Sequence, residues 1–164
     1  MSSQRLFKVG AMSLLCLGSF AASQANAAGT ATTSIAVTAT VESACTISTT
    51  PLAFTAFTGT AVVNGEATLS VICSNAADYT IGLGAGSGTV AQRVMTGPAG
   101  ATLNYGLYQE DTHTTPWGDT AGTTLAGTGN GAQQDITVYG QIAANQLTSS
   151  VGDYTDTVAV TITY

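Results

Sequence analysis

The chain has 164 residues, of which only 7% are charged, and its three basic and nine acidic residues give a formal net charge of −6 at pH 7. Arg5 and Lys8 lie near the N-terminus, which leaves Arg93 as the only other basic residue. So acidic a chain disfavours nucleic acid and anionic membranes as partners. The lack of lysine beyond residue 8 also excludes Schiff-base chemistry from the rest of the protein.

The N-terminal segment has the pattern of a secretory signal peptide. Two positive charges precede the apolar run VGAMSLLCLGSFAA, and Ala-Asn-Ala at positions 25–27 is a small-residue cleavage site. We therefore expect residues 1–27 to be removed, together with Cys16. Residues 28–164 then remain as one domain's length of exported chain.

Two cysteines remain after the signal, Cys45 and Cys73. In an exported protein the simplest expectation is one disulfide, which would tie neighbouring strands or join one sheet to another. A metal pair and two free thiols are the alternatives. A metal site would need more cysteine or histidine ligands, and His113 is the only histidine.

The composition favours strands over helices, because Thr, Val and Gly are abundant while Lys, Arg, Glu and Leu are scarce. Asn64-Gly65 predicts a tight turn, and the strand after it should bury Ala67, Leu69, Val71 and Cys73 on one face. Alternation of apolar and polar residues predicts strands over 32–41, 44–48, 52–57, 66–74, 79–84, 101–109, 135–142 and 154–164.

Short strands without helical intervals indicate an all-β fold, in the form of a single antiparallel sandwich or barrel, and a two-sheet sandwich suits the disulfide. The polar intervals 84–100 and 110–134 are expected to be loops or irregular edge strands. Within the first, GLGAGSG fits neither dinucleotide-binding nor phosphate-loop spacing.

The densest polar cluster is QEDTHTTPWGD at 109–119, and its ligands lack the spacing of a metal site. We expect a solvated loop that Trp117 anchors to the sandwich. Arg93 is expected to pair with an acid. No catalytic residue, metal or cofactor is predicted, so the protein should not be an enzyme. Sugar binding by exposed aromatic residues is a weaker alternative.

The last strand has the cleanest pattern, with Val158, Val160, Ile162 and Tyr164 on one side. An apolar strand face at a sheet edge needs a cover. Residues 32–41 alternate similarly, with Ile35, Val37, Ala39 and Val41 on one face. This segment either completes its own sandwich, giving a monomer, or completes a neighbouring one, which would build a filament.

The chain contains a series of short motifs in this order: the cysteine pair, Arg93-Val94-Met95, LNYGLYQ (103–109), Trp117-Gly118-Asp119, Val138-Tyr139-Gly140, Gln146 and the ending GDYTDTVAVTITY. With these motifs the chain resembles the spore coat protein U domain family, the pilin-like subunits of archaic chaperone–usher fimbriae. Gln141 and Ala143 depart from it, since the family often has a basic residue and a proline there.

The resemblance implies an immunoglobulin-like sandwich that lacks its final strand and is completed by a donor strand. Residues 28–42 would be the donor extension and residues 43–164 the domain. Ile35, Val37, Ala39 and Val41 would fill the groove of another subunit. The terminal strand would form one wall of the acceptor groove and bind the chaperone, through Val158, Val160, Ile162 and Tyr164.

The implied partners are a periplasmic pilus chaperone, an outer-membrane usher and identical or related pilin subunits, without nucleic acid or membrane insertion. The implied function is that of a structural fimbrial subunit, exported through the periplasm to the cell surface for attachment and biofilm formation. One alternative is a spore or cell-envelope coat protein exported by the same route. Another is a self-contained secreted sandwich that binds carbohydrate through Trp117 and its loop.

Overall fold

The structure is a computed structural model that describes residues 28–164. The predicted signal peptide, residues 1–27, lies outside the described residues. The chain divides into two parts between Ala39 and Thr40, and each is described by itself. Residues 28–39 form no helix or strand, and their side chains are exposed. Residues 40–164 form the folded domain.

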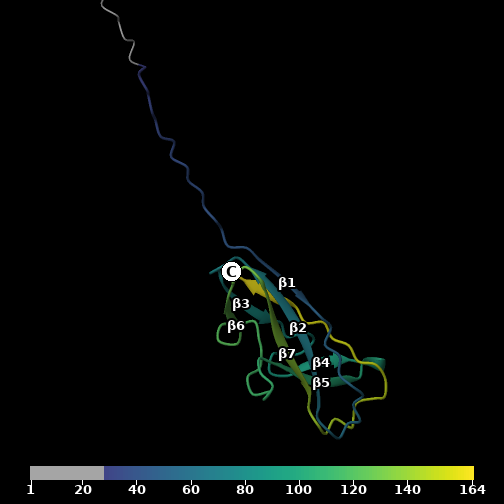
Figure 1. Cartoon of the computed structure of the whole chain (residues 1–164). Helices are drawn as coiled ribbons and strands as arrows, with labels where there is room; N and C mark the ends of the chain where they lie inside the picture. Colours follow the sequence, from purple (N-terminus) through teal and green to yellow (C-terminus); the bar gives the residue numbers. More distant parts are fainter. Residues whose placement is uncertain (1–27) are drawn as a thin grey trace, which may run out of the picture. The chain divides into compact units, whose positions relative to one another are not determined.

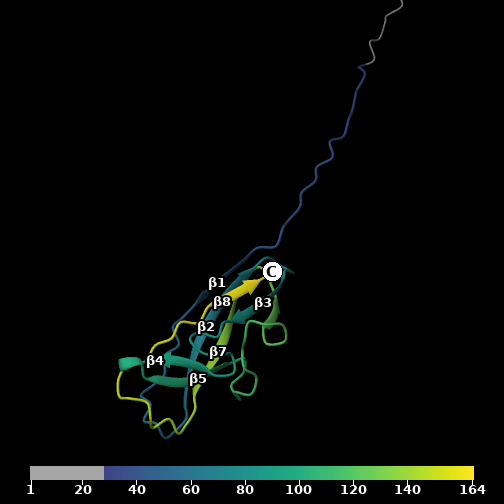
Figure 2. The same cartoon turned by 180° about the vertical axis from the view of Figure 1, so that it is seen from behind.

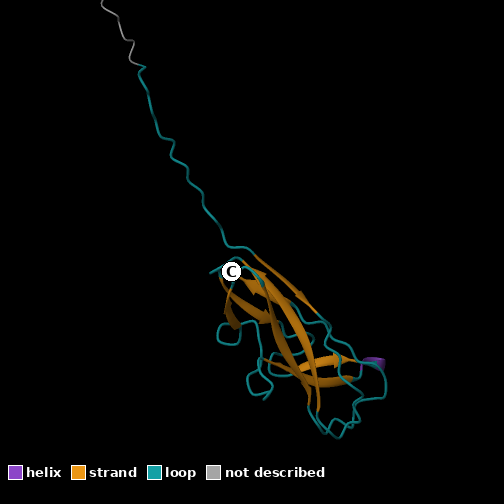
Figure 3. Cartoon of the chain, in the orientation of Figure 1, coloured by secondary structure: helices purple, strands orange, loops and turns teal. Residues whose placement is uncertain are grey.

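The domain consists of eight strands and one short 3-10 turn, and the described residues contain no α-helix (Figure 3). The elements in chain order are β1 (Cys45–Thr49), β2 (Val63–Cys73), β3 (Asp78–Leu83), β4 (Arg93–Thr96), η1 (Pro98–Gly100), β5 (Thr102–Tyr108), β6 (Leu125–Thr128), β7 (Gln133–Ile142) and β8 (Val160–Thr163).

The strands form two antiparallel sheets, one in the order β1-β2-β7-β5-β4 and the other in the order β6-β3-β8. The predicted all-β sandwich is confirmed. Strand β1 lies at an edge of the five-stranded sheet and β8 at an edge of the three-stranded sheet, and these two edge strands are in contact with each other (Figures 1 and 2).

The core lies between the sheets and is built by alternation. Strand β2 buries every second side chain, and its inward face is the one that the sequence predicts: Ala67, Leu69, Val71 and Cys73 are all at most 7% exposed. Strands β3, β5 and β7 add further buried side chains to the same cluster, namely Tyr79, Ile81, Leu83, Leu103, Tyr105, Leu107, Val138 and Ile142. This burial of apolar side chains is the main term that holds the sheets together.

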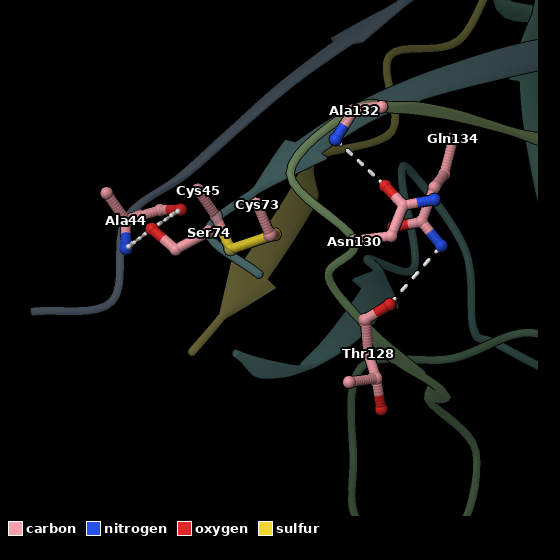
Figure 4. Close-up of a disulfide and its surroundings, with 8 residues drawn as sticks. All are labelled: Ala44, Cys45, Cys73, Ser74, Thr128, Asn130, Ala132 and Gln134. Atoms are coloured by element: carbon pink, nitrogen blue, oxygen red, sulfur yellow. Dashed lines mark hydrogen bonds between the residues drawn. A yellow bond between two sulfur atoms is a disulfide. The ribbon is translucent and has the colours of Figure 1, made fainter. Parts of the chain in front are cut away.

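A disulfide joins Cys45 to Cys73, which are directly opposite each other in the pairing of β1 with β2. It therefore ties neighbouring strands of one sheet and does not join the two sheets. Ser74 donates its backbone N–H to the carbonyl of Ala44 at 2.9 Å and so continues the pairing one step past the disulfide. Figure 4 shows these residues at the end of the β1–β2 pair.

The turn predicted at Asn64-Gly65 is wrong, because both residues lie inside β2. Gly65 is opposite Gly140 in the sheet, and a Cβ on either glycine would crowd Leu52 and Phe54, at 2.8–3.3 Å from their side-chain carbons. The pair of glycines therefore makes room for two large side chains, which is a tertiary requirement and not a turn signal.

The two polar intervals each contain one short edge strand, β4 in the first and β6 in the second. The strand predicted over 52–57 is not formed, and neither is the first part of the one predicted over 154–164. In the described chain residues 52–57 have no ladder partner, and residues 154–159 have only the isolated bridge from Thr155 to Thr96. Both stretches belong to the candidate site below.

Replacing both Cys45 and Cys73 by alanine should lower the free energy of unfolding by about 3–4 kcal/mol, the chain-entropy value for a loop of this size. The closed loop has a sequence separation of 28. Urea denaturation of the variant and the oxidised protein measures the difference. The oxidised protein with a reductant added should lose a similar amount, and equal stability of all samples would contradict the expectation.

Candidate functional site

The segment before β8 presents an alternating face to the core. Tyr154, Val158, Val160 and Ile162 are half-buried and pack against the core, while the residues between them face solvent, except Asp156. Only Val160–Thr163 form a strand, which pairs with β3. The apolar face is therefore only partly covered along its whole length. Tyr164 differs from the other predicted residues because it is 56% exposed.

A second segment, residues 51–58 after β1, has the same character. Leu52, Phe54 and Phe57 are half-buried and pack against the core. Within the described part of the chain, residues 51–58 form no backbone–backbone hydrogen bond. Their N–H and C=O groups are thus free to pair with another strand, a property that proteins normally suppress at sheet edges.

These two segments continue the edges that β1 and β8 form. Residues 51–58 continue the chain from β1, and residues 154–159 lead into β8. Tyr105 lies between the two, because its ring packs against Phe54 with centroids 6.2 Å apart and its hydroxyl donates to Asp156 at 2.7 Å. The arrangement can accept an extended, apolar strand, since it offers both half-buried side chains and unpaired backbone groups.

The terminal segment is held firmly by its neighbours. Thr155 and Thr96 exchange two backbone hydrogen bonds of 2.9 and 3.0 Å, and the N–H of Gly84 donates to the carbonyl of Ala159 at 2.8 Å. Through Thr155 the segment touches β4 of one sheet, and through β8 it joins the other. Residues 154–163 therefore link the two sheets.

Asp156 fixes this segment to the glycine loop that follows β3. Its carboxylate accepts hydrogen bonds from the Ser87 hydroxyl at 2.9 Å and the Ser87 N–H at 3.1 Å, besides that from Tyr105. Gly86 has φ +61°, and a Cβ there would overlap the Asp156 carboxylate. Only glycine fits this approach.

These hydrogen bonds also determine the titration of the pair. Burial acts to raise the pKa of Asp156, but the hydrogen bonds from Tyr105, Ser87 and the Thr157 N–H outweigh it and lower that pKa. Burial, with the hydrogen bond to Asp156, raises the pKa of Tyr105. Asp156 is therefore ionised and Tyr105 neutral at neutral pH.

Arg93 does not pair with an acid, so that expectation is wrong. Its side chain is fully buried and donates to four backbone carbonyls, those of Leu83 (3.0 Å), Gly84 (2.9 Å), Val90 (3.3 Å) and Trp117 (2.7 Å). Burial lowers the pKa of Arg93, whereas the nearby acidic groups, among them Asp119 and Asp156, act in the opposite direction.

Trp117 is fully buried, as the expectation of an anchored loop requires, and its indole N–H donates to the carbonyl of Ile81 at 2.9 Å. A ring with no exposed face cannot stack on a sugar. The proposed carbohydrate site at Trp117 is therefore wrong, because the buried indole belongs to the core.

The polar loop before Trp117 is organised by Glu110. Its carboxylate accepts from the hydroxyl of Thr114 at 2.7 Å and from the backbone N–H groups of Thr114 and Thr115, and these bonds, the Thr114 hydroxyl foremost, lower the pKa of Glu110 to about 2. His113 packs on Tyr108 instead of turning toward the acids. In the described range, no three His, Cys, Asp or Glu side chains gather closely enough to hold a metal ion.

The side chains of the predicted donor residues are exposed. Ile35, Val37 and Val41 are 85–91% exposed, and Ala39 is exposed as well. Sequence reasoning missed Leu52, Phe54 and Phe57 as site residues. Their signal is present in LAFTAF, whose alternation predicts a strand over 52–57 but does not by itself assign that strand to a site.

Residues 31–161 match the family described as "Spore Coat Protein U domain". The chain belongs to this family. The family is one of structural subunits and not of enzymes. Among curated proteins the chain is similar to Protein U of Myxococcus xanthus, with 35% identity over 108 residues, which is 61% of this chain and 60% of Protein U.

The fold is similar to that of a chain in the crystal structure of the CsuC–CsuE chaperone–tip adhesion subunit pre-assembly complex from the archaic chaperone–usher Csu pili of Acinetobacter baumannii. The TM-score is 0.58 at 19% identity, over 76% of this chain and 41% of the Csu chain. The chain thus spans less than two thirds of either relative. Among residues 28–164 there is no helix of the length and hydrophobicity needed to span a membrane.

Asp156→Asn should destabilise the domain at neutral pH and much less in acid. Because the pKa of Asp156 is lowered from 3.8, its ionised form stabilises the folded state above about pH 4, and this contribution is lost as the pH falls through the lowered folded-state pKa. Urea midpoints of wild type and variant, measured from pH 7 to pH 2, should therefore converge in acid.

The matched control is Asp153→Asn, which removes a nearby exposed carboxylate. This control should differ little from the wild type at any pH. If the urea midpoint of Asp156→Asn stays below that of the wild type by the same amount down to pH 2, the carboxylate charge is not what stabilises the segment.

Proposed function

We propose that this protein is a structural subunit of a chaperone–usher fimbria and polymerises by donor-strand exchange. The observation that carries the proposal is the pair of half-covered segments, 51–58 and 154–162, on the side of the sandwich where β1 and β8 meet. One extended strand inserted between them would cover both apolar faces and pair with the free backbone groups of residues 51–58.

Residues 32–41 supply a suitable strand. The side chains of Ile35, Val37, Ala39 and Val41 alternate with those of small residues, and in the described chain they are exposed. Val158, Val160 and Ile162 would receive them on one side, and Leu52, Phe54 and Phe57 on the other. Each subunit would then carry one donor and one acceptor, which is what an open, head-to-tail polymer requires.

The energetics favour occupation of this site. Burying four apolar side chains contributes roughly 6–12 kcal/mol of gross hydrophobic free energy before ordering costs. This is comparable with the whole stability of a typical domain. A subunit without a donor is therefore expected to be marginally stable, and an occupied one hard to separate.

The same site would bind a periplasmic chaperone before assembly, and an outer-membrane usher would be the place of exchange. The fold likeness to a chain from a chaperone–subunit pre-assembly complex supports this route. We infer that the protein is exported through the periplasm and lies in a surface fimbria, where it serves attachment and biofilm formation.

A second candidate is a coat protein of a spore or cell envelope, exported and assembled in the same way. The family description and the likeness to Protein U favour it. Immunogold labelling separates the two, because a fimbrial subunit labels thin fibres that extend from the cell, whereas a coat protein labels a continuous layer.

Moving the donor strand should raise the melting temperature. One variant lacks residues 28–41, and a second lacks them but carries a copy of 32–41 after Tyr164 through a short flexible linker. We expect the second to melt tens of degrees higher, since each kcal/mol shifts the midpoint of a domain of this size by several degrees. Thermal unfolding followed by circular dichroism measures both.

The control is the second variant with Val37→Asp in the appended copy, which keeps the length and linker but puts a charge into the site. It should melt like the variant that has no donor. If all three melt alike, the sandwich is complete without a donor and strand exchange is excluded.

A further inference from the structure

The large apolar side chains that the folded domain leaves exposed lie at its two ends. Strand β2 has 11 residues and is therefore about 35 Å long, with Val63 at one end and Cys73 at the other. Its register with β7 places Val63 beside Ile142 and Ile72 beside Gln133. The loops before β2 and after β7 thus lie together, far from the disulfide (Figure 1).

We name the end that lies far from the disulfide the loop end. It is formed by residues 58–62, 97–101 and 143–152. The N–H of Gln146 donates to the carbonyl of Gly59, and the Ser149 hydroxyl donates to the carbonyl of Thr102, so the loops hold one another. None of the three segments contains a charged residue. At their tips Val62, Leu147 and Val151 are 49%, 71% and 101% exposed.

The opposite end, which we name the disulfide end, contains the Cys45–Cys73 bridge and the end of β8. Its exposed apolar side chains are Val41 (91%), Ile72 (46%) and Tyr164 (56%). The folded domain, residues 40–164, exposes no other large apolar side chain to a comparable degree. Both ends therefore carry apolar surface that is unfavourable in water.

The chain itself limits where a neighbouring subunit can lie. Only residues 42–44 separate the donor segment from β1, so Val41 and Cys45 are at most about 14 Å apart. This inference rests on the proposed strand exchange. If residues 32–41 are inserted into an acceptor domain, the short linker places the disulfide end of the donor domain against one end of the acceptor domain. Which end it abuts depends on the direction of the donor strand.

A donor parallel to β8 would bring two disulfide ends together. That end would then have to contact both the preceding and the following subunit, while the loop end contacted neither. A donor antiparallel to β8 brings the disulfide end of one subunit to the loop end of the next. This second arrangement gives each neighbour its own surface and repeats head to tail, as an open polymer requires.

We propose that the loop end is a docking surface for the disulfide end of a second copy of this chain. Val62, Leu147 and Val151 pack there against the neighbour's surface around Ile72 and Tyr164. The contact adds a rigid joint to the inserted strand, so the fibre is stiff instead of a string of hinged domains. The uncharged loops suit this role, since the neighbour's end carries the acids Glu42 and Asp78 and lacks exposed cations.

The test is photo-cross-linking in intact fibres purified from producing cells. A photo-reactive phenylalanine analogue replaces Val151, and the cross-linked peptides are identified by mass spectrometry. We expect adducts with residues of the neighbour's disulfide end. The matched control carries the analogue at Ala121, an exposed loop position beside the outer face of the three-stranded sheet, and should give none of these adducts.

A second measurement uses Leu147→Asp with Val151→Asp, compared with Ala121→Asp. The double variant should still form heat-resistant oligomers, because the strand-binding site is untouched, but its fibres should bend severalfold more in electron micrographs. Ala121→Asp fibres should match the wild type.

The outcomes separate the two proposals. If the wild type forms no heat-resistant oligomers, strand exchange fails. If fibres form but residue 151 does not cross-link to the neighbour's disulfide end, the docking surface alone is overturned. Double-variant fibres that stay straight but no longer adhere to hydrophobic plastic would also overturn it, because the loop end would then contact a foreign surface.

Discussion

The guanidinium group of Arg93 organises the interior at the point where the regular strands end. It donates to the carbonyls of Leu83, Gly84 and Trp117, and also to that of Val90, in a site with no solvent exposure. A buried carbonyl without a hydrogen-bond donor costs about 1–3 kcal/mol. The planar guanidinium group supplies donors to all four carbonyls, which would otherwise each need a separate donor. Removing it would leave the carbonyls of the glycine loop and of Trp117 without this donor.

The consequences extend to the edge of the sandwich. Gly84, held by Arg93 through its carbonyl, donates its N–H to Ala159, and the loop beyond it brings Ser87 to Asp156. The terminal segment is therefore supported from behind by a network that is in place before any partner binds. Residues 51–58 have no such support. One edge is prearranged and the other is free to adjust, which suits a site where strands are exchanged.

Low charge is the second constraint on this molecule. The single arginine of residues 28–164 is buried, so the exposed charged groups of the described domain are carboxylates. The most exposed large apolar side chains are those of the donor residues and of the two domain ends. A chain with so few charges has few ways to disfavour wrong contacts. Its apolar residues are instead placed where an ordered polymer would cover them.

The sequence by itself determined the all-β class, the inward face of β2, and the apolar alternation of residues 32–41 and 154–164, because a period of two depends only on neighbouring residues. It could not show that Arg93 binds carbonyls, which carbonyl accepts the indole N–H of Trp117, or that Asn64-Gly65 lies inside a strand. Each of these depends on groups far away in the chain: the ends of β3, the carbonyl of Ile81, and the side chains of Leu52 and Phe54. Alternation of apolar and polar residues also predicted a strand at LAFTAF, because alternation indicates which side chains are buried. Only the tertiary structure decided that this segment has no ladder partner, because pairing depends on which backbone lies beside it.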